Sequence, residues 1–254
     1  MQNQMQNQTR SCSWIKNQIQ WMATLLRSVP KAVPILFVLT VITMNFLARI
    51  TLVSLPWLAL NAGISVSWLC FLLMDVVTKH FGAKAANLLA ILAILGNLAC
   101  SLLCFVISQI WSAPALDMIL GGQWSVLTAS TIAYIVSALV NNYTNIFIGR
   151  FFRKDPDGKG AYIARSYIST FLSQTLDNFL FVFLAFVVFP YIPGALQVRW
   201  TVWQCIGCSL TGAVLELLTE AIFSPIGYRI NRKWKEKGVG REYLDAYGTE
   251  EGSL

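Results

Sequence analysis

Residues 85–111 read AANLLAILAILGNLACSLLCFVISQIW, and this stretch decides the fold. It carries no charged side chain, and its polar side chains are few and scattered. A helix needs about 20 consecutive, mostly apolar residues to cross the hydrocarbon core of a bilayer. The stretch is therefore long and apolar enough to cross a membrane as a helix.

Five other stretches meet the same criterion of length and composition. The six together are 32–54, 57–79, 85–111, 124–150, 163–190 and 200–228. Pro30 and Pro34 suit the first turn of the first helix, where a missing backbone N–H costs nothing. Pro56 predicts a very tight hairpin between the first two helices. The sequence therefore predicts an all-α membrane protein with six transmembrane helices.

The overall composition agrees with a chain that lies in lipid. Hydrophobic residues make up 56% and charged residues only 12%, whereas a soluble domain has about 25% charged residues. A net charge of +7 can also indicate a nucleic-acid-binding protein, but such a protein gathers its cations on one soluble face. Here the cations lie in short loops and tails between apolar stretches. We expect membrane lipid around the chain and no nucleic-acid partner.

The placement of Lys and Arg predicts the orientation. Four precede the first helix, two follow the second, five follow the fourth and six follow the sixth, so 17 of 19 lie on one side. Cytoplasmic loops carry this excess of positive charge. Only Arg49 and Arg199 lie toward the other side. We expect both termini in the cytoplasm.

Three regions follow from this reading: a polar N-terminal tail (1–31), a six-helix transmembrane domain (32–228) and a basic cytoplasmic C-terminal tail (229–254). The first tail contains one mainly apolar stripe at helical spacing, made of Trp14, Gln18, Trp21, Met22 and Leu25. This stripe indicates either an amphipathic helix in the membrane interface or a cytoplasmic extension of the first transmembrane helix. The sequence does not decide between the two.

Ionisable groups at bilayer depth are costly, so they are candidates for function by default. Asp177 lies in the fifth predicted helix, and Glu216 and Glu220 lie in the sixth, four residues apart and so on one face. Neutral polar residues at similar depth are Asn45, Asn141, Asn142, Gln174 and Asn178. The three carboxylates can converge on one polar cavity. The alternative is that each one is bonded to a neighbouring helix and only holds the bundle together.

The second predicted helix adds Trp68, Phe71 and Asp75. Trp68 lies in mid-membrane, where it can stack on a flat ligand or pack against another helix. Asp75 precedes Lys79 by four residues, the spacing of an ordinary ion pair on a helix. His80 is the only histidine.

Several classes of activity lack the residues that they need. A single histidine rules out a His-based metal site, and the Cys205–Cys208 pair has no second pair or nearby histidine. No Walker A pattern is present, so the chain hydrolyses no nucleotide by itself. We expect no enzyme, no cofactor and no metal, and a small-molecule importer is the reading that remains.

Four motifs occur in order along the chain. Asp75, Thr78 and Gly82 form Asp-x-x-Thr-x-x-x-Gly; the fifth helix opens with RSYIST at 165–170; Glu220 and Pro225 precede a basic tail; and Asn45 precedes Arg49 by one turn. Together they resemble the queuosine precursor transporter family, also called the vitamin uptake transporter family. The resemblance covers roughly residues 35–235.

The resemblance implies a six-helix importer similar to the substrate-binding components of energy-coupling-factor transporters. It would bring queuine, preQ0 or preQ1, which are deazaguanine bases, across the bacterial inner membrane. A guanine-like edge presents adjacent N–H donors to a carboxylate, and its flat ring suits aromatic stacking. The substrate-binding residues that we expect are Asp177, Glu220, Glu216, Gln174, Asn178, Arg165, Asn45, Asp75, Trp68, Phe71 and Asn141.

Further questions stay open. The resemblance leads us to expect an Asp or a Gln/Asp combination in the fourth helix, where this chain has Asn141 and Asn142, and this departure leaves the ligand preference or the coupling ion undecided. The chain can also be a substrate-binding subunit for another vitamin-like molecule that needs an ATP-driven coupling module. The sequence leaves the question of a homo-oligomer open.

Overall fold

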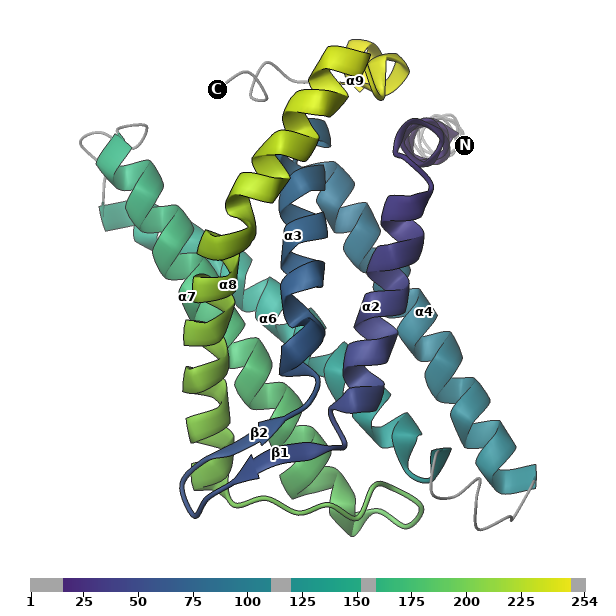
Figure 1. Cartoon of the computed structure of the whole chain (residues 1–254), viewed down its shortest axis with the longest axis vertical. Helices are drawn as coiled ribbons and strands as arrows, with labels where there is room; N and C mark the ends of the chain where they lie inside the picture. Colours follow the sequence, from purple (N-terminus) through teal and green to yellow (C-terminus); the bar gives the residue numbers. More distant parts are fainter. Residues whose placement is uncertain (1–15, 111–119, 152–158, 248–254) are drawn as a thin grey trace, which may run out of the picture.

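The computed structural model describes residues 16–110, 120–151 and 159–247, and the side chains of these except 141–146, 148–170 and 220. The longest helices in this part of the chain run roughly alongside one another (Figure 1). They are α2 (Ala32–Leu47), α3 (Ile64–Phe81), α4 (Ala83–Ile110), α6 (Gln123–Phe151), α7 (Lys159–Phe183) and α8 (Val202–Lys237).

Each of these helices contacts the next in a closed ring, in the order α2, α3, α8, α7, α6, α4 and back to α2. Five of them have a stretch that is long and apolar enough to cross a membrane unaided. The exception is α2, whose 16 residues extend about 24 Å, which is less than the roughly 30 Å of hydrocarbon. It meets the test only together with the preceding helix, Lys16–Ser28. The fold is thus an all-α membrane protein, as predicted.

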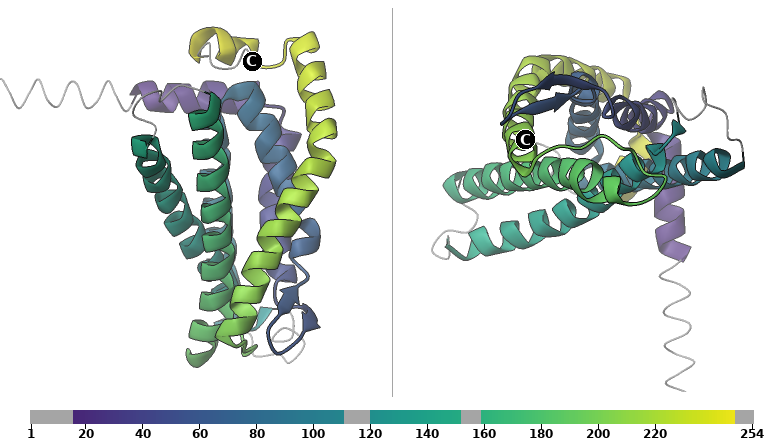
Figure 2. Two further views of the ribbon diagram at one scale, coloured as in Figure 1. Left: turned by 90° about the vertical axis from the view of Figure 1, so that its left-hand side faces the viewer. Right: turned by 90° about the horizontal axis from the view of Figure 1, so that it is seen from below.

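The N-terminal helix, Lys16–Ser28, is bent by 95° from α2 and lies across the end of the bundle (Figure 2). It is therefore not a straight extension of the first transmembrane helix. Leu25 of this helix is buried and Trp21 and Met22 pack against the same cluster, whereas Gln18 is exposed. Three of the predicted stripe residues thus face protein, and Trp14 lies outside the described residues.

The predicted tight hairpin at Pro56 is wrong. After α2 ends at Leu47, the chain forms two antiparallel strands, β1 (Thr51–Ser54) and β2 (Ala59–Asn61), before α3 begins. Apolar composition alone does not separate a strand from a helix. β-branched residues at 51 and 53 favour the extended form, and Pro56 cannot continue a helix. The first two helices are accordingly shorter than 32–54 and 57–79.

The last helices also differ from the predicted bounds. α7 continues into a π-helical turn, Leu184–Val188, and a 3-10 turn, Phe189–Tyr191. α8 starts with a capping box in which Thr201 and Gln204 satisfy each other's backbone N–H groups. It runs unbroken to Lys237, well past the predicted end at 228, and a short helix, α9 (Arg241–Tyr247), follows. The N-terminal helix and α9 lie at the same end of the bundle (Figures 1 and 2).

Candidate functional site

Asp177 lies on α7 and is held by a side chain of α6. The Ser137 hydroxyl donates a hydrogen bond of 2.9 Å to Asp177 Oδ1. The polar residue at mid-helix thus marks a contact between α6 and α7, the most extensive helix pairing in the bundle.

Glu216 lies on α8 and is only 6% exposed. Asn178 of α7 donates a hydrogen bond of 3.2 Å from Nδ2 to Glu216 Oε1. Gly212, one turn before Glu216, makes room for this amide, because a Cβ at Gly212 would lie 3.1 Å from Asn178 Nδ2. The close approach of α7 and α8 therefore depends on a residue without a side chain.

The two acids belong to one site. Asp177 and Asn178 are adjacent on α7, so the contact of Asp177 with α6 and the contact of Asn178 with Glu216 of α8 lie one residue apart. We call Ser137, Asp177, Asn178 and Glu216 the carboxylate cluster. Gln174, one turn before Asn178, adds a buried Oε1 that has no hydrogen-bond partner among the side chains that the structure describes.

The cluster is rich in hydrogen-bond acceptors. Carboxylate and amide oxygens accept, whereas the donors within the described part of the cluster are one hydroxyl and one amide group. Such a site suits a ligand with several N–H donors, or one with a positive charge.

Asn45, which we expected in the substrate site, belongs to a different network. Its Nδ2 donates to Asn97 Oδ1 at 3.2 Å, and Asn97 Nδ2 donates to the Leu127 carbonyl at 3.1 Å. Gln123 Nε2 donates to the Asn45 carbonyl at 3.0 Å. These buried side chains join α2, α4 and α6. We call Asn45, Asn97 and Gln123 the amide network.

The expected residues of α3 face α8 rather than the carboxylate cluster. Asp75 forms the predicted ion pair with Lys79, at 2.8 Å. Trp68 stacks on Phe223 of α8 with ring centroids 4.3 Å apart, so it packs between helices. Phe71 lies half-buried one turn further along α3. Phe223 is two helical turns, about 10 Å, beyond Glu216.

Three expected side chains lie outside the described residues, namely Glu220, Arg165 and Asn141, and so does the neighbouring Asn142. The structure places the backbone of Glu220 in α8, that of Arg165 in α7 and that of the two asparagines in α6. These are the helices that also supply the carboxylate cluster.

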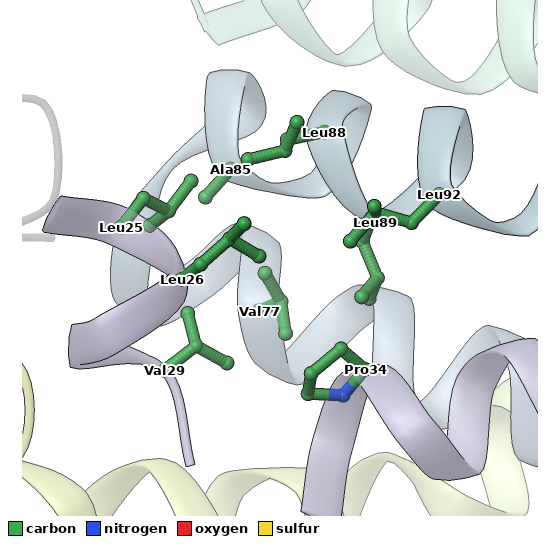
Figure 3. A pocket seen from close by; sticks show the side chains of 9 residues that line it. All are labelled: Leu25, Leu26, Val29, Pro34, Val77, Ala85, Leu88, Leu89 and Leu92. Atoms are coloured by element: carbon green, nitrogen blue, oxygen red, sulfur yellow. The ribbon is translucent and has the colours of Figure 1, made fainter. Parts of the chain in front are cut away.

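A pocket lies at the other side of the bundle, between the N-terminal helix, α2, α3 and α4 (Figure 3). Its lining is apolar throughout: Leu25, Leu26, Val29, Pro34, Val77, Ala85, Leu88, Leu89 and Leu92. It offers no polar group to orient a nitrogen-rich ligand. We therefore place the candidate site at the carboxylate cluster.

The family model described as "putative vitamin uptake transporter" matches residues 61–230. The match includes α3, α4, α6, α7 and most of α8, and with them the whole carboxylate cluster. The chain belongs to this family. No curated protein and no solved structure matches the chain. Membership of the vitamin uptake transporter family confirms the resemblance seen in the sequence, and it identifies a multi-pass membrane protein of a small-molecule uptake family.

The family match also separates two parts of the chain. It starts at residue 61 and ends at residue 230. The N-terminal helix, α2 and α9 therefore lie outside it, and so does Asn45.

The sequence reading missed Ser137, because a serine in a membrane helix usually bonds its own helix. Only its position across from Asp177 distinguishes it.

Proposed function

We propose that this chain imports queuosine precursors, namely queuine, preQ0 or preQ1, across the bacterial cytoplasmic membrane with both termini in the cytoplasm. The observation that carries the proposal is the carboxylate cluster, in which α6, α7 and α8 bring two acids to one place within a transmembrane bundle. Family membership supports uptake of a vitamin-like small molecule. The precursor itself is inferred from chemistry and from the motif resemblance.

The chemistry of the cluster fits a deazaguanine base. The base presents a ring N–H and an exocyclic amine on one edge, and a carboxylate accepts such a pair of donors in bidentate fashion. The aminomethyl group of preQ1 is cationic, and the second carboxylate of the cluster can pair with it. Asp177 and Glu216 are then substrate-binding residues, while Ser137 and Asn178 orient them.

Growth in a suitable host tests the proposal. The host lacks its own precursor synthesis and uptake, and the readout is the queuosine content of its tRNA after feeding each precursor in turn. The unmodified chain restores queuosine with at least one precursor. If none of the precursors restores it while the protein is present in the membrane, the proposed substrate class is wrong.

Point variants tie the activity to the site. Asp177→Asn and Glu216→Gln remove one charge each without changing shape. We expect each to lower uptake by about 10- to 100-fold, the range that corresponds to one charge-assisted hydrogen bond. Glu220→Gln is expected to act in the same direction. Glu236→Gln, which alters only an exposed ion pair on α8, is the matched control and keeps normal uptake.

Reconstitution distinguishes the proposal from the alternative of a subunit that needs an ATP-driven partner. If the purified chain in liposomes takes up a labelled precursor, it is a transporter by itself. If it binds the precursor with the expected variant pattern and does not move it, a coupling module is required.

A further inference from the structure

Four aromatic side chains from four helices meet at the end of the bundle that carries the N-terminal helix and α9. Trp21 Nε1 donates a hydrogen bond of 3.3 Å to the Tyr243 hydroxyl. Tyr243 is 2% exposed, and its ring lies 6.0 Å from Phe81 of α3. Phe81 in turn lies 5.9 Å from Trp234 of α8. We call Trp21, Phe81, Trp234 and Tyr243 the aromatic clasp.

Directly beside the aromatic clasp is a buried histidine with one unused nitrogen. His80 Nε2 lies 2.9 Å from the Val239 carbonyl. A carbonyl only accepts, so Nε2 carries the proton and Nδ1 of the neutral ring is an acceptor. His80 is 7% exposed, and its Nδ1 has no hydrogen-bond partner in the part of the chain that the structure describes.

A second unpaired acceptor lies on the facing helix. Asn231 of α8 is 8% exposed, and its Oδ1 likewise has no hydrogen-bond partner among the described residues. Asn231 precedes Trp234 by three residues, and Trp234 packs edge-on against His80 at 5.3 Å. Buried polar atoms are almost always hydrogen-bonded. Two unbonded acceptors, His80 Nδ1 and Asn231 Oδ1, at one helix contact indicate that the protein has a second conformation, in which a donor reaches them.

One face of α8 leads from the carboxylate cluster to these atoms. Glu216, Phe223, Gly227, Asn231 and Trp234 recur at helical spacing, so they form a single stripe about 27 Å long. The stripe faces α3 along its length beyond Glu216. Phe223 contacts Trp68, a Cβ at Gly227 would lie 3.5 Å from Asp75 Oδ2, and Trp234 contacts His80.

The polar groups along this contact share one chemical character. Asp75 Oδ2, His80 Nδ1 and Asn231 Oδ1 are all acceptors, as are the oxygens of the carboxylate cluster. One cation along this contact forms an ion pair among the described residues: Lys79 binds Asp75. A ligand rich in N–H donors therefore meets suitable groups from Glu216 to the aromatic clasp.

We propose that the contact between α3 and α8 is the inner exit path of the substrate, and that the aromatic clasp is the gate that closes it. The proposal rests on the importer function proposed above. In the closed form the clasp joins the N-terminal helix and α9 over the ends of α3 and α8. When the gate opens, Tyr243 moves away from Trp21. N–H groups of the substrate then donate to His80 Nδ1 and Asn231 Oδ1.

The gate is built largely from parts that the family match does not include. Trp21, Trp234 and Tyr243 all lie outside residues 61–230, whereas Phe81, His80 and the carboxylate cluster lie within them. The device thus adds two terminal helices to the family core. The gate therefore lies mostly outside the region that matches the family, whereas the substrate site lies within it.

Cysteine labelling tests the gate independently of transport. Asn231→Cys is introduced into the full chain, and a membrane-impermeant maleimide is added from the side of the termini. The labelling rate is measured as the excess over the rate for the chain that carries only its native cysteines. We expect slow labelling in the closed form, and an increase of about tenfold when Tyr243→Ala is added, the ratio that corresponds to one lost hydrogen bond and its ring packing.

Two further variants make the result decisive. Tyr243→Phe keeps the ring and removes only the hydroxyl that accepts from Trp21, so it gives a smaller increase even if Tyr243→Ala fails to fold. Glu236→Gln is the control and leaves the labelling rate unchanged. Unchanged labelling in a folded Tyr243→Phe chain, or in both Tyr243 variants, overturns the gate.

Transport completes the test. In liposomes the Tyr243 variants change the rate of precursor uptake while the Kd for the precursor stays within about twofold, because the clasp touches the path and not the carboxylate cluster. If the clasp only stabilises the fold, the Tyr243 variants lower the amount of folded protein. The labelling rate and the uptake rate per folded molecule then stay the same. If the unmodified chain neither binds nor takes up any precursor, the importer is refuted. Unaltered uptake in both Tyr243 variants refutes the gate alone.

Discussion

At the scale of single residues, the bundle contains two kinds of buried polar group. In the amide network, Asn45, Asn97 and Gln123 supply donors and acceptors to one another and to backbone carbonyls. In the carboxylate cluster, acceptors exceed donors, and the nearby Gln174 Oε1 has no partner. The amide network also contains one buried acceptor without a partner among the described residues, Gln123 Oε1. What distinguishes the carboxylate cluster as a ligand site is therefore its two acids at bilayer depth.

Asn97→Ala separates these roles. It leaves the buried Asn45 amide without the Asn97 acceptor, which costs about 1–3 kcal/mol, whereas the Leu127 carbonyl keeps the hydrogen bond from the Thr131 hydroxyl. We expect the melting temperature to fall by several degrees while the Kd for the precursor is unchanged. Leu98→Ala, an exposed neighbour on α4, is the control for thermal unfolding. A large loss of affinity with normal stability would place the amide network in the substrate site instead.

Ser137→Ala has the opposite expected signature. Ser137 holds Asp177 Oδ1, so its loss lets the carboxylate turn away from the ligand, and we expect a Kd about tenfold weaker. Combined with Asp177→Asn, it should add little, because both changes remove the same interaction. Isothermal titration of the four proteins measures this. Ser209→Ala is the control, since Ser209 bonds only its own helix. Additive losses would show that Ser137 acts independently of Asp177.

The sequence predicts some residues of the site and misses others. Asp177, Asn178 and Glu216 stand out in the sequence because polar groups at depth are costly, and the structure does bring them together. Ser137 does not stand out, since it is one of many serines in apolar helices. Asn45 was assigned to the substrate site on depth and resemblance, although its partner Asn97 lies 52 residues away. Such pairings depend on how the helices pack, which depth alone does not reveal.

At the scale of elements, helix existence was predictable from composition, and helix ends were not. The stretch 85–111 matches α4, Ala83–Ile110, closely. The stretch 32–54 does not match α2, because the residues after Leu47, with β-branched Thr51 and Val53 among them, form β1 instead. The bend between the N-terminal helix and α2 was one of two open readings. Tertiary burial of Leu25 decides it, and the sequence holds no local signal for that burial.

Gly207→Ala tests how the β-hairpin is held. A Cβ at Gly207 would lie 2.3 Å from the Trp57 carbonyl, so the hairpin has to move away from α8. The hydrogen bond from Gln204 Nε2 to the Leu55 carbonyl, now 2.9 Å, should be lost with it. We expect a loss of about 1–3 kcal/mol in stability, measured by thermal unfolding. Leu210→Ala, which is exposed on the same helix, should change little. Wild-type stability in Gly207→Ala would mean that the hairpin is free to shift.

At the scale of the whole molecule, the ring order α2, α3, α8, α7, α6, α4 explains which polar groups meet. α7 and α8 are neighbours, so Asn178 reaches Glu216, and α6 adjoins α7, so Ser137 reaches Asp177. The amide network lies across the ring, where α2, α4 and α6 contact one another. Hydropathy and charge predict the number and direction of helices. The ring order needs tertiary contacts, and no single-sequence pattern supplies it.

The distribution of charge makes a prediction about orientation. Seventeen of 19 Lys and Arg residues are expected on one side, and positively charged loops stay in the cytoplasm. Tags at the two termini should be digested by protease in inside-out vesicles and protected in right-side-out ones. Replacing Lys79 and Lys84 should disturb this pattern more than it weakens substrate affinity. A terminus that is protected in inside-out vesicles would contradict the proposed topology.

The most direct test of the central claim is binding of queuine, preQ0 and preQ1 to the purified full chain, measured by isothermal titration beside Asp177→Asn, Glu216→Gln and Glu236→Gln. The account predicts saturable binding of at least one precursor, a Kd weakened about 10- to 100-fold in the first two variants, and an unchanged Kd in Glu236→Gln. Equal affinity in all four proteins, or no binding of any precursor by the folded unmodified chain, would contradict it.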